Sequence, residues 1–308
     1  MLKILVTGVN GFVGKHLVRE LKARELEVLG LGTEDVPSPE IADQLDDYFS
    51  CDLTDKIQVD ALPLENVDTI INLAGLANVG ASFGAEELYK KVNVEVLTTL
   101  GERLLDSKEK ARLIAVSTGA VYDPKQQTPL TEESKLITEG SPYALSKIMM
   151  EEAAQELQKQ GLDCIIVRPF NHVGPGQAPG FLLPDLYQKL LDAKETGKPV
   201  TVGNLTTKRD YTDVRDVVRA YSDLATAETL QDNLFNVCSG TSRTGQSVLD
   251  ALVSEMGLKD KVTIDVDQSL IRPNDPADLY GSFERLSDET GWEPEIPFEQ
   301  TIKDIVNQ

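Results

Sequence analysis

The sequence has few cysteines and no long apolar run. Only three of its 308 residues are cysteines. Cys51, Cys164 and Cys238 lie in apolar stretches without close spacing, which indicates buried thiols and argues against a disulfide framework or a metal site. No apolar run approaches the roughly 20 residues that span a bilayer. The first apolar stretch begins at Lys3, which leaves no room for a signal peptide, so we expect a cytoplasmic protein without membrane segments.

Basic charge is also scarce. Lys and Arg number 30 against 51 Asp and Glu, a formal net charge of −21 at pH 7. A nucleic-acid backbone needs a basic face, and no cluster of Lys or Arg appears, so we expect no nucleic-acid partner. An anionic small molecule would need a few arginines in its site to reverse the local potential.

Three glycines stand at the start of the chain. Gly8, Gly11 and Gly14 follow the apolar stretch Lys3–Thr7 and open the apolar-periodic segment Phe12–Leu21. This pattern predicts a strand, a glycine turn and a helix. A pyrophosphate can rest on the N–H groups of a helix N-terminus only where no Cβ blocks it, so the turn predicts a dinucleotide site. The alternative is an ordinary strand-to-helix turn with glycines for packing.

Lys147 follows Tyr143 by four positions, which places a phenol and an ammonium on one helix face. A nearby cation favours phenolate, so we expect Lys147 to lower the pKa of Tyr143 from about 10 and to make it usable in acid–base chemistry. Taken alone, such a pair is more often a tyrosine packed on an aliphatic stem.

The order of apolar segments predicts an α/β protein with a Rossmann-type doubly wound parallel sheet. Predicted strands are Ile4–Val6, Val28–Leu29, Thr69–Ile71, Leu113–Val116 and Cys164–Val167, and predicted helices are Glu86–Asp106 and Pro142–Gln160. After Arg168 prolines and glycines break the pattern, as expected of a smaller α/β C-terminal substrate domain.

These motifs resemble the extended short-chain dehydrogenase/reductases that act on nucleotide sugars, and the resemblance covers nearly the whole chain. Its further motifs are Cys51-Asp52-Leu53, Asn72-Leu73-Ala74-Gly75, Val92-Asn93-Val94, 117–122 and 168–176. The strings 202–205, 209–216 and 236–240 are similar to those of one subgroup, the GDP-4-keto-6-deoxymannose reductases. The resemblance implies a dinucleotide-binding domain of residues 1–170 plus about 209–238. It implies a nucleotide-sugar-binding domain of about 171–208 and 239–308.

NADP or NAD is the implied cofactor. The implied cofactor residues are Gly8, Gly11, Phe12, Val13, Gly14, Asp52, Leu53, Leu73, Ala74, Gly75, Asn93, Tyr143, Lys147 and Pro169. An acid at the tip of the second strand would bind the ribose 2′-hydroxyl of NAD and repel the phosphate of NADP. Here the predicted strand Glu27–Gly32 ends in glycine, and Glu34 and Asp35 only follow it, which favours NADPH.

The resemblance also implies catalytic and substrate residues, and no metal. Tyr143 would protonate the substrate, Lys147 would bind the nicotinamide ribose, and Thr118 would orient the carbonyl. The alternative for Thr118 is a strand-end threonine that caps the next turn. The implied substrate residues are Ser82, Thr118, Asn171, Asn204, Arg209 and Arg272, the two arginines holding the diphosphate and nucleoside.

We therefore expect a reductase that transfers a hydride from NADPH or NADH to the 4-keto carbon of a GDP-linked 6-deoxyhexulose. Gly119 and Ala120 stand where similar 4,6-dehydratases carry an acid, which argues against dehydration. Two alternatives stay open: a UDP-hexose 4-epimerase and a non-catalytic dinucleotide-binding regulator. We also expect a homodimer formed through the predicted helices Glu86–Asp106 and Pro142–Gln160.

Overall fold

A parallel sheet of seven strands forms the centre of the larger part of the molecule. The structure is a computed structural model that describes residues 1–107, 110–270 and 277–308. In spatial order the strands are β10 (Leu234–Val237), β6 (Cys164–Pro169), β5 (Arg112–Val116), β4 (Thr69–Asn72), β1 (Lys3–Thr7), β2 (Glu27–Gly32) and β3 (Asp47–Ser50). Every neighbouring pair is parallel, so all seven carboxyl ends meet at one edge.

Helices cover both faces of this sheet because consecutive strand residues point to opposite sides. In β1, Ile4 and Val6 pack in a core with α1 (Phe12–Ala23) and α7 (Val214–Thr226). Leu5 packs on the other face, in a core with α4 (Glu86–Asp106) and α5 (Pro142–Lys159). Two short helices, α2 (Lys56–Asp60) and α3 (Val79–Ser82), precede α4. The predicted doubly wound fold is confirmed.

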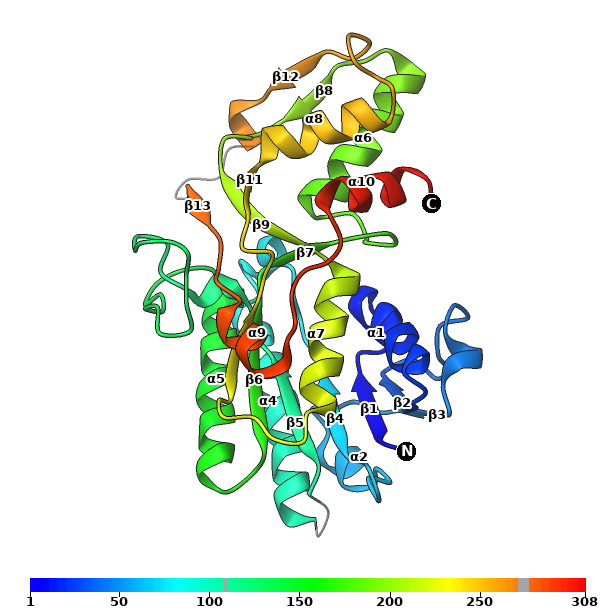
Figure 1. Ribbon diagram of the computed structural model, residues 1–308, viewed down its shortest axis with the longest axis vertical. Helices are drawn as coiled ribbons and strands as arrows, with labels where there is room; N and C mark the ends of the chain where they lie inside the picture. The colour runs from blue at the N-terminus through cyan, green and yellow to red at the C-terminus, as the bar shows by residue number, and fades with distance from the viewer. Residues whose placement is uncertain (108–109, 271–276) are drawn as a thin grey trace.

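The smaller part of the molecule lies beyond the carboxyl ends of the large sheet (Figure 1). Its apolar core lies among α6 (Leu182–Thr196), α8 (Gly245–Glu255) and α10 (Phe298–Val306). One small sheet contains β7 (Asn171–Val173), β9 (Lys208–Asp213), β11 (Ser242–Thr244) and β13 (Asp278–Leu279), and another pairs β8 (Val200–Val202) with β12 (Ile264–Val266). Helix α9 (Glu284–Thr290) returns to the large sheet, where Leu286 joins its core. The predicted smaller C-terminal domain is confirmed.

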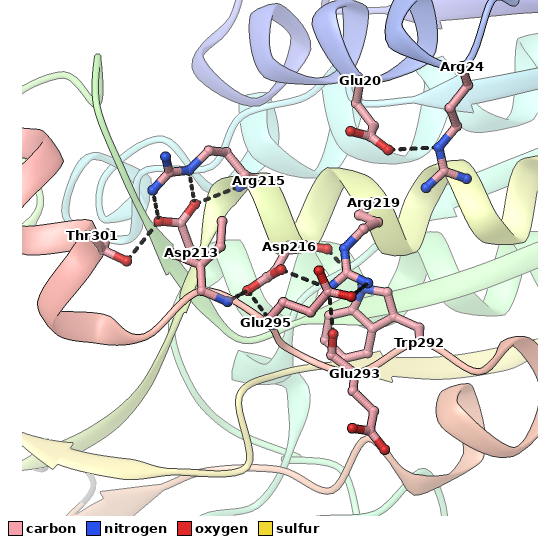
Figure 2. Close-up of polar contacts among 11 residues, drawn as sticks. Glu20, Arg24, Asp213, Arg215, Asp216, Arg219, Trp292, Glu293, Glu295 and Thr301 are labelled. Carbon is pink, nitrogen blue, oxygen red and sulfur yellow. Dashed lines mark hydrogen bonds and ion pairs between the residues drawn. The ribbon is translucent and has the colours of Figure 1, made fainter.

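Asp213 connects the two parts at the start of α7, as Figure 2 shows. Its side chain caps the helix by accepting from the backbone N–H of Arg215 at 2.8 Å. It also pairs with the Arg215 guanidinium and accepts from the Thr301 hydroxyl of α10 at 2.7 Å. One buried carboxylate therefore fixes the orientation of a C-terminal helix relative to α7.

Asp216, one turn further along α7, holds the segment before α10 (Figure 2). Its Oδ2 accepts from the backbone N–H groups of Glu295 and Ile296 at 3.1 and 2.9 Å. Its backbone carbonyl accepts from Trp292 Nε1 at 3.0 Å, and Oδ1 accepts from Arg219 at 2.8 Å. These contacts fix the segment Trp292–Ile296 on α7.

Two strands of the large sheet escape prediction from the sequence. β3 is a four-residue edge strand with partly exposed side chains, so it lacks the continuous apolar run of a buried strand. β10 pairs with β6, although the chain passes through the smaller part of the molecule between them.

Within the described ranges, no helix is both long and apolar enough to cross a bilayer.

Candidate active site

The three predicted glycines build the turn between β1 and α1. Gly8 has φ +63°, and a Cβ there would lie 3.0 Å from the backbone nitrogen of Ala74. A Cβ on Gly14 would lie 2.5 Å from the carbonyl oxygen of Val9. Gly11 is the N-cap of α1 and has no side chain to bond the N–H groups of the first turn. The turn therefore fits a dinucleotide, whose pyrophosphate needs such N–H groups.

The segment after β4 lies directly beside this turn. Thr7 Oγ1 donates to Asn72 Oδ1 at 2.6 Å and accepts from the backbone N–H of Ala74 at 3.0 Å. The carbonyl carbon of Leu73 would lie 3.1 Å from a Cβ on Gly8. Leu73 and Ala74, both predicted cofactor residues, thus form one wall of the glycine turn.

Gly75 connects this wall to the helix that carries the tyrosine–lysine pair. A Cβ on Gly75 would lie 2.7 Å from Asn93 Oδ1 and 3.7 Å from Lys147 Nζ. Asn93 also accepts from the backbone N–H of Leu76 at 2.8 Å and donates to Ser146 Oγ at 2.9 Å. Asn93 therefore fixes the loop after β4 relative to α5.

The other predicted cofactor residues lie around the same strand ends. Phe12 and Val13 begin α1, and buried Pro169 ends β6. Asp52 is exposed just after β3, where its carboxylate accepts from Thr54, and Leu53 is buried beside it. Contacts of these residues with a cofactor stay predictions.

Tyr143 and Thr118 come together at the carboxyl ends of the strands. Tyr143 lies in the first turn of α5 and is 7% exposed, with its ring edge-on to Tyr89. A side-chain hydrogen bond joins it to Thr118, which follows β5. Thr118 also accepts from the backbone N–H of Ala120 at 3.2 Å, so it caps the next turn as well as contacting Tyr143.

Lys147 lies one turn after Tyr143 and is 8% exposed. Its ammonium donates to the carbonyl oxygen of Val116 at 2.8 Å. Burial lowers the pKa of Lys147 to about 8, although the carboxylate of Glu151 opposes this shift.

The expected lowering of the Tyr143 pKa is wrong for this structure. Burial raises the pKa of Tyr143, and the opposing contribution is the hydrogen bond from Thr118. The physical reason is desolvation of the phenolate in a site where the lysine ammonium is directed to Val116. Proton donation by Tyr143 is the role that a raised pKa suits.

A buried ion pair beneath the site was not predicted from the sequence. Glu151 and Arg168 form two hydrogen bonds of 2.6 and 2.9 Å and are 2% and 3% exposed. Glu151 also accepts from Ser117 at 2.5 Å, next to Thr118. Because Glu151 follows Lys147 by four residues, helical spacing could have placed Glu151 near the site, but no local pattern indicated its pairing with Arg168 of β6.

An acid does reach the tip of β2, contrary to the sequence-based expectation. A Cβ on Gly32 would lie 2.8 Å from Oε2 of Glu34. The chain turns back after β2, which brings an acid two residues further along onto the strand end. The expected preference for NADPH rested on the absence of such an acid.

The predicted substrate residues lie on several elements of the smaller part. Asn171 is exposed on β7, which pairs with β9, the strand that carries half-buried Arg209. Asn204 precedes β9, and its side chain accepts from the backbone N–H of Thr206 at 2.9 Å. Arg272 lies outside the described residues.

Ser82, the predicted hexose contact, bonds to the backbone of its own turn, and its contact with a sugar stays a prediction. It is 0% exposed, and its hydroxyl donates to the carbonyl oxygen of Val79 at 2.7 Å. The physical reason is that Ser82 ends the short helix α3.

Across the described residues, no group of three or more His, Cys, Asp or Glu side chains could hold a metal ion.

Known proteins resemble this chain over its whole length. The GDP-6-deoxy-D-mannose reductase of Pseudomonas aeruginosa is 28% identical over 309 residues, which cover 99% of this chain and 96% of that protein. The structure of RMD from Pseudomonas aeruginosa complexed with NADPH has a TM-score of 0.83 and 28% identity, covering 100% of this chain and 98% of that one. The UDP-glucose 4-epimerase of Thermus thermophilus complexed with NAD has a TM-score of 0.84 and 28% identity, covering 99% and 98%.

The family model agrees with the site. The model of the NAD dependent epimerase/dehydratase family matches residues 4–238, from β1 to just after β10. This range includes the glycine turn and the helix of Tyr143 and Lys147. The chain belongs to the NAD dependent epimerase/dehydratase family.

Proposed function

We propose that this protein reduces the 4-keto group of a nucleotide-linked 4-keto-6-deoxyhexose, with GDP as the nucleotide. The observation that carries the proposal is the grouping of Thr118, Tyr143 and Lys147 beside the glycine turn. The 28% identity to a GDP-6-deoxy-D-mannose reductase over nearly the whole chain supports the choice of substrate.

Each of the three side chains has a role that its environment supports. When bound, NADH or NADPH supplies the hydride. Tyr143, whose pKa is raised by burial, donates its proton to the oxygen of the former carbonyl. Thr118 holds the phenol by a hydrogen bond and orients the carbonyl, while the Lys147 ammonium lies beside Gly75 and would bind the nicotinamide ribose when the cofactor is present.

Dehydration is disfavoured by the residues that follow Thr118. A Cβ on Gly119 would lie 2.9 Å from Cγ of the Phe170 ring, so this position does not accommodate an acid without displacing the ring. Ala120 carries no proton donor. An acid would be needed to expel water from a sugar, and reduction needs no second acid.

The test is an assay with purified protein and a GDP-4-keto-6-deoxyhexose. We expect oxidation of NADH or NADPH only when the 4-keto sugar nucleotide is present, with one reduced cofactor consumed per product. The matched control is the GDP-hexose that carries a 4-hydroxyl, which should cause no oxidation. Absence of oxidation with any 4-keto sugar nucleotide would contradict the proposal.

A UDP-hexose 4-epimerase is the second candidate, favoured by the likeness to the Thermus thermophilus epimerase. An epimerase returns the hydride to the same substrate and gains from retaining its dinucleotide, whereas a reductase must exchange it. We expect the protein to be purified largely free of cofactor. Stoichiometric NAD after gel filtration, with interconversion of UDP-hexoses and no net NAD(P)H oxidation, would favour the epimerase.

We also propose a homodimer formed through α4 and α5. On α5, Leu145, Ile148, Met149 and Ala153 stay only partly buried, although the helix already packs on the large sheet and on α4. A second copy would cover these apolar side chains. Light scattering at micromolar concentration should give twice the monomer mass of 33.8 kDa, and a monomer would contradict the proposal.

A further inference from the structure

The carboxylate of Glu34 lies against the end of β2. A Cβ on Gly32, the last residue of the strand, would lie 2.8 Å from Glu34 Oε2 and 2.8 Å from the Tyr48 hydroxyl. Gly32 therefore admits two polar side chains to the strand tip, where a larger residue would exclude them. In doubly wound folds this tip, beside the glycine turn, faces the adenosine ribose of a dinucleotide.

Contacts from two segments hold Glu34 in this position. Asn10 of the glycine turn donates from Nδ2 to Glu34 Oε2 at 2.9 Å. The Tyr48 hydroxyl of β3 donates to the backbone carbonyl of Glu34 at 2.7 Å. Asn10 is itself fixed, because its Oδ1 accepts from the backbone N–H of Ser38 at 2.8 Å. The carboxylate is thus joined to the same turn that would bind the pyrophosphate.

Among the described residues, no Lys or Arg side chain acts on the Glu34 carboxylate. Lys15 and Arg19 of α1 both pair with Glu40, at 2.6 and 3.6 Å. The hydrogen bond from Asn10 lowers the pKa of Glu34, so it is ionised at neutral pH. A 2′-phosphate at the strand tip would therefore meet the negative charge of Glu34.

We propose that Glu34 selects NAD(H) over NADP(H) in this protein. Its carboxylate can accept a hydrogen bond from a ribose 2′-hydroxyl, and it repels a 2′-phosphate. Asn10 and Tyr48 position the carboxylate for this contact. The inference concerns dinucleotide binding only and is independent of the sugar that the protein reduces.

The test measures binding, without turnover, by calorimetric titration of the full-length protein with NADH and with NADPH. We expect the wild-type protein to bind NADH about 10- to 100-fold more tightly than NADPH, the range of one close like-charge contact. In Glu34→Gln this ratio should fall to about threefold or less, chiefly through tighter NADPH binding. Raising the salt concentration should also reduce the wild-type ratio, because the carboxylate is exposed.

Asp35→Asn is the matched control, since it removes the same charge from the exposed neighbouring residue. Its ratio should stay within about twofold of the wild-type value, because the atoms nearest a Cβ on Gly32 belong to Glu34, Tyr48 and Asn10 and not to Asp35. Equal or tighter binding of NADPH by the wild type, an unchanged ratio in Glu34→Gln, or an equal effect of Asp35→Asn would overturn the proposal. Failure to bind either dinucleotide would overturn it as well. NADH-selective binding without reduction of 4-keto sugars would contradict only the proposed function.

Discussion

At the residue scale, Tyr143 is the side chain on which the proposed chemistry depends. Replacing it by Phe removes the phenolic proton and keeps the ring that packs on Tyr89. We expect Tyr143→Phe to reduce turnover roughly 10²- to 10⁴-fold, the usual contribution of a positioned general acid. The measurement is the steady-state rate with saturating 4-keto substrate.

Cofactor binding by Tyr143→Phe is the control. The dissociation constant for NADH and the melting temperature should stay near the wild-type values, because the phenol bonds Thr118 and not the glycine turn. Turnover close to the wild-type rate in the Phe variant would show that another group donates the proton.

Lys147 gives a pH-dependent prediction. Its pKa is lowered from 10.5 to about 8 in the folded protein, so above pH 8 the folded chain loses this proton before the unfolded chain does. Because the unfolded state then binds more protons, Lys147 makes the wild type more stable as the pH rises from 8 to 10.5. Below pH 8 both states are charged, and burial of the ammonium is a constant cost.

The comparison with Lys147→Met isolates this effect. We expect the free energy of unfolding of the wild type, minus that of the variant, to increase by about 2 to 3 kcal/mol between pH 7.5 and pH 10. Urea titrations at the two pH values measure the difference, in which other titrating groups cancel. A difference that does not change with pH would place the Lys147 pKa near its ordinary value.

At the scale of elements, local sequence patterns predict the buried strands and the long helices well. The predicted helix Glu86–Asp106 has the bounds of α4, and the Tyr143–Lys147 spacing does lie on one helix. These features depend on residues close together in the chain. β3 and β10 depend on pairing with distant strands, which leaves little local signal.

The same limit explains the errors at the site. Glu34 reaches the strand tip through a contact with Asn10, 24 residues earlier, and through Tyr48, 14 residues later. Glu34 is only two residues from the strand tip, but the contacts that place its carboxylate there come from distant residues, which local sequence does not show. The spacing of Tyr143 and Lys147 gave their common helix face correctly, but the direction of the lysine ammonium depends on Val116 of β5.

The junction between α7 and the C-terminal segment gives a prediction at the scale of elements. Asp216→Ala would remove a buried carboxylate and leave two partly buried backbone N–H groups and Arg219 without their partner. We expect a loss of about 2 to 4 kcal/mol in the free energy of unfolding, as for a broken buried network. Denaturant titration measures the loss.

Asp304→Ala is the control at the same junction. Asp304 pairs with Arg215 at 2.7 Å but is partly exposed, so its removal should cost less than about 1 kcal/mol. Equal losses in the two variants would mean that the Asp216 contacts contribute no more than a surface ion pair does.

At the scale of the whole molecule, the charge of −21 must be reconciled with an anionic substrate. The glycine turn contributes helix N–H groups, and Arg209 lies on β9 in the smaller part of the molecule. Helix N–H groups and a guanidinium can bind phosphate locally although the overall charge is negative. Adding salt should therefore weaken this binding less than it weakens anion binding to a basic surface, because the local donors and not the net charge attract the ligand.

The base of the nucleotide can be identified from the stability of the whole protein. A ligand that binds only the folded protein stabilises it by RT ln(1 + [L]/Kd), which is about 2.7 kcal/mol at 100 times Kd. For a chain of this size that corresponds to a rise of about 4 °C in the melting temperature. At equal concentrations, we expect GDP to raise the melting temperature more than UDP, TDP or CDP does. A larger rise with UDP would contradict the GDP-linked substrate and favour the epimerase.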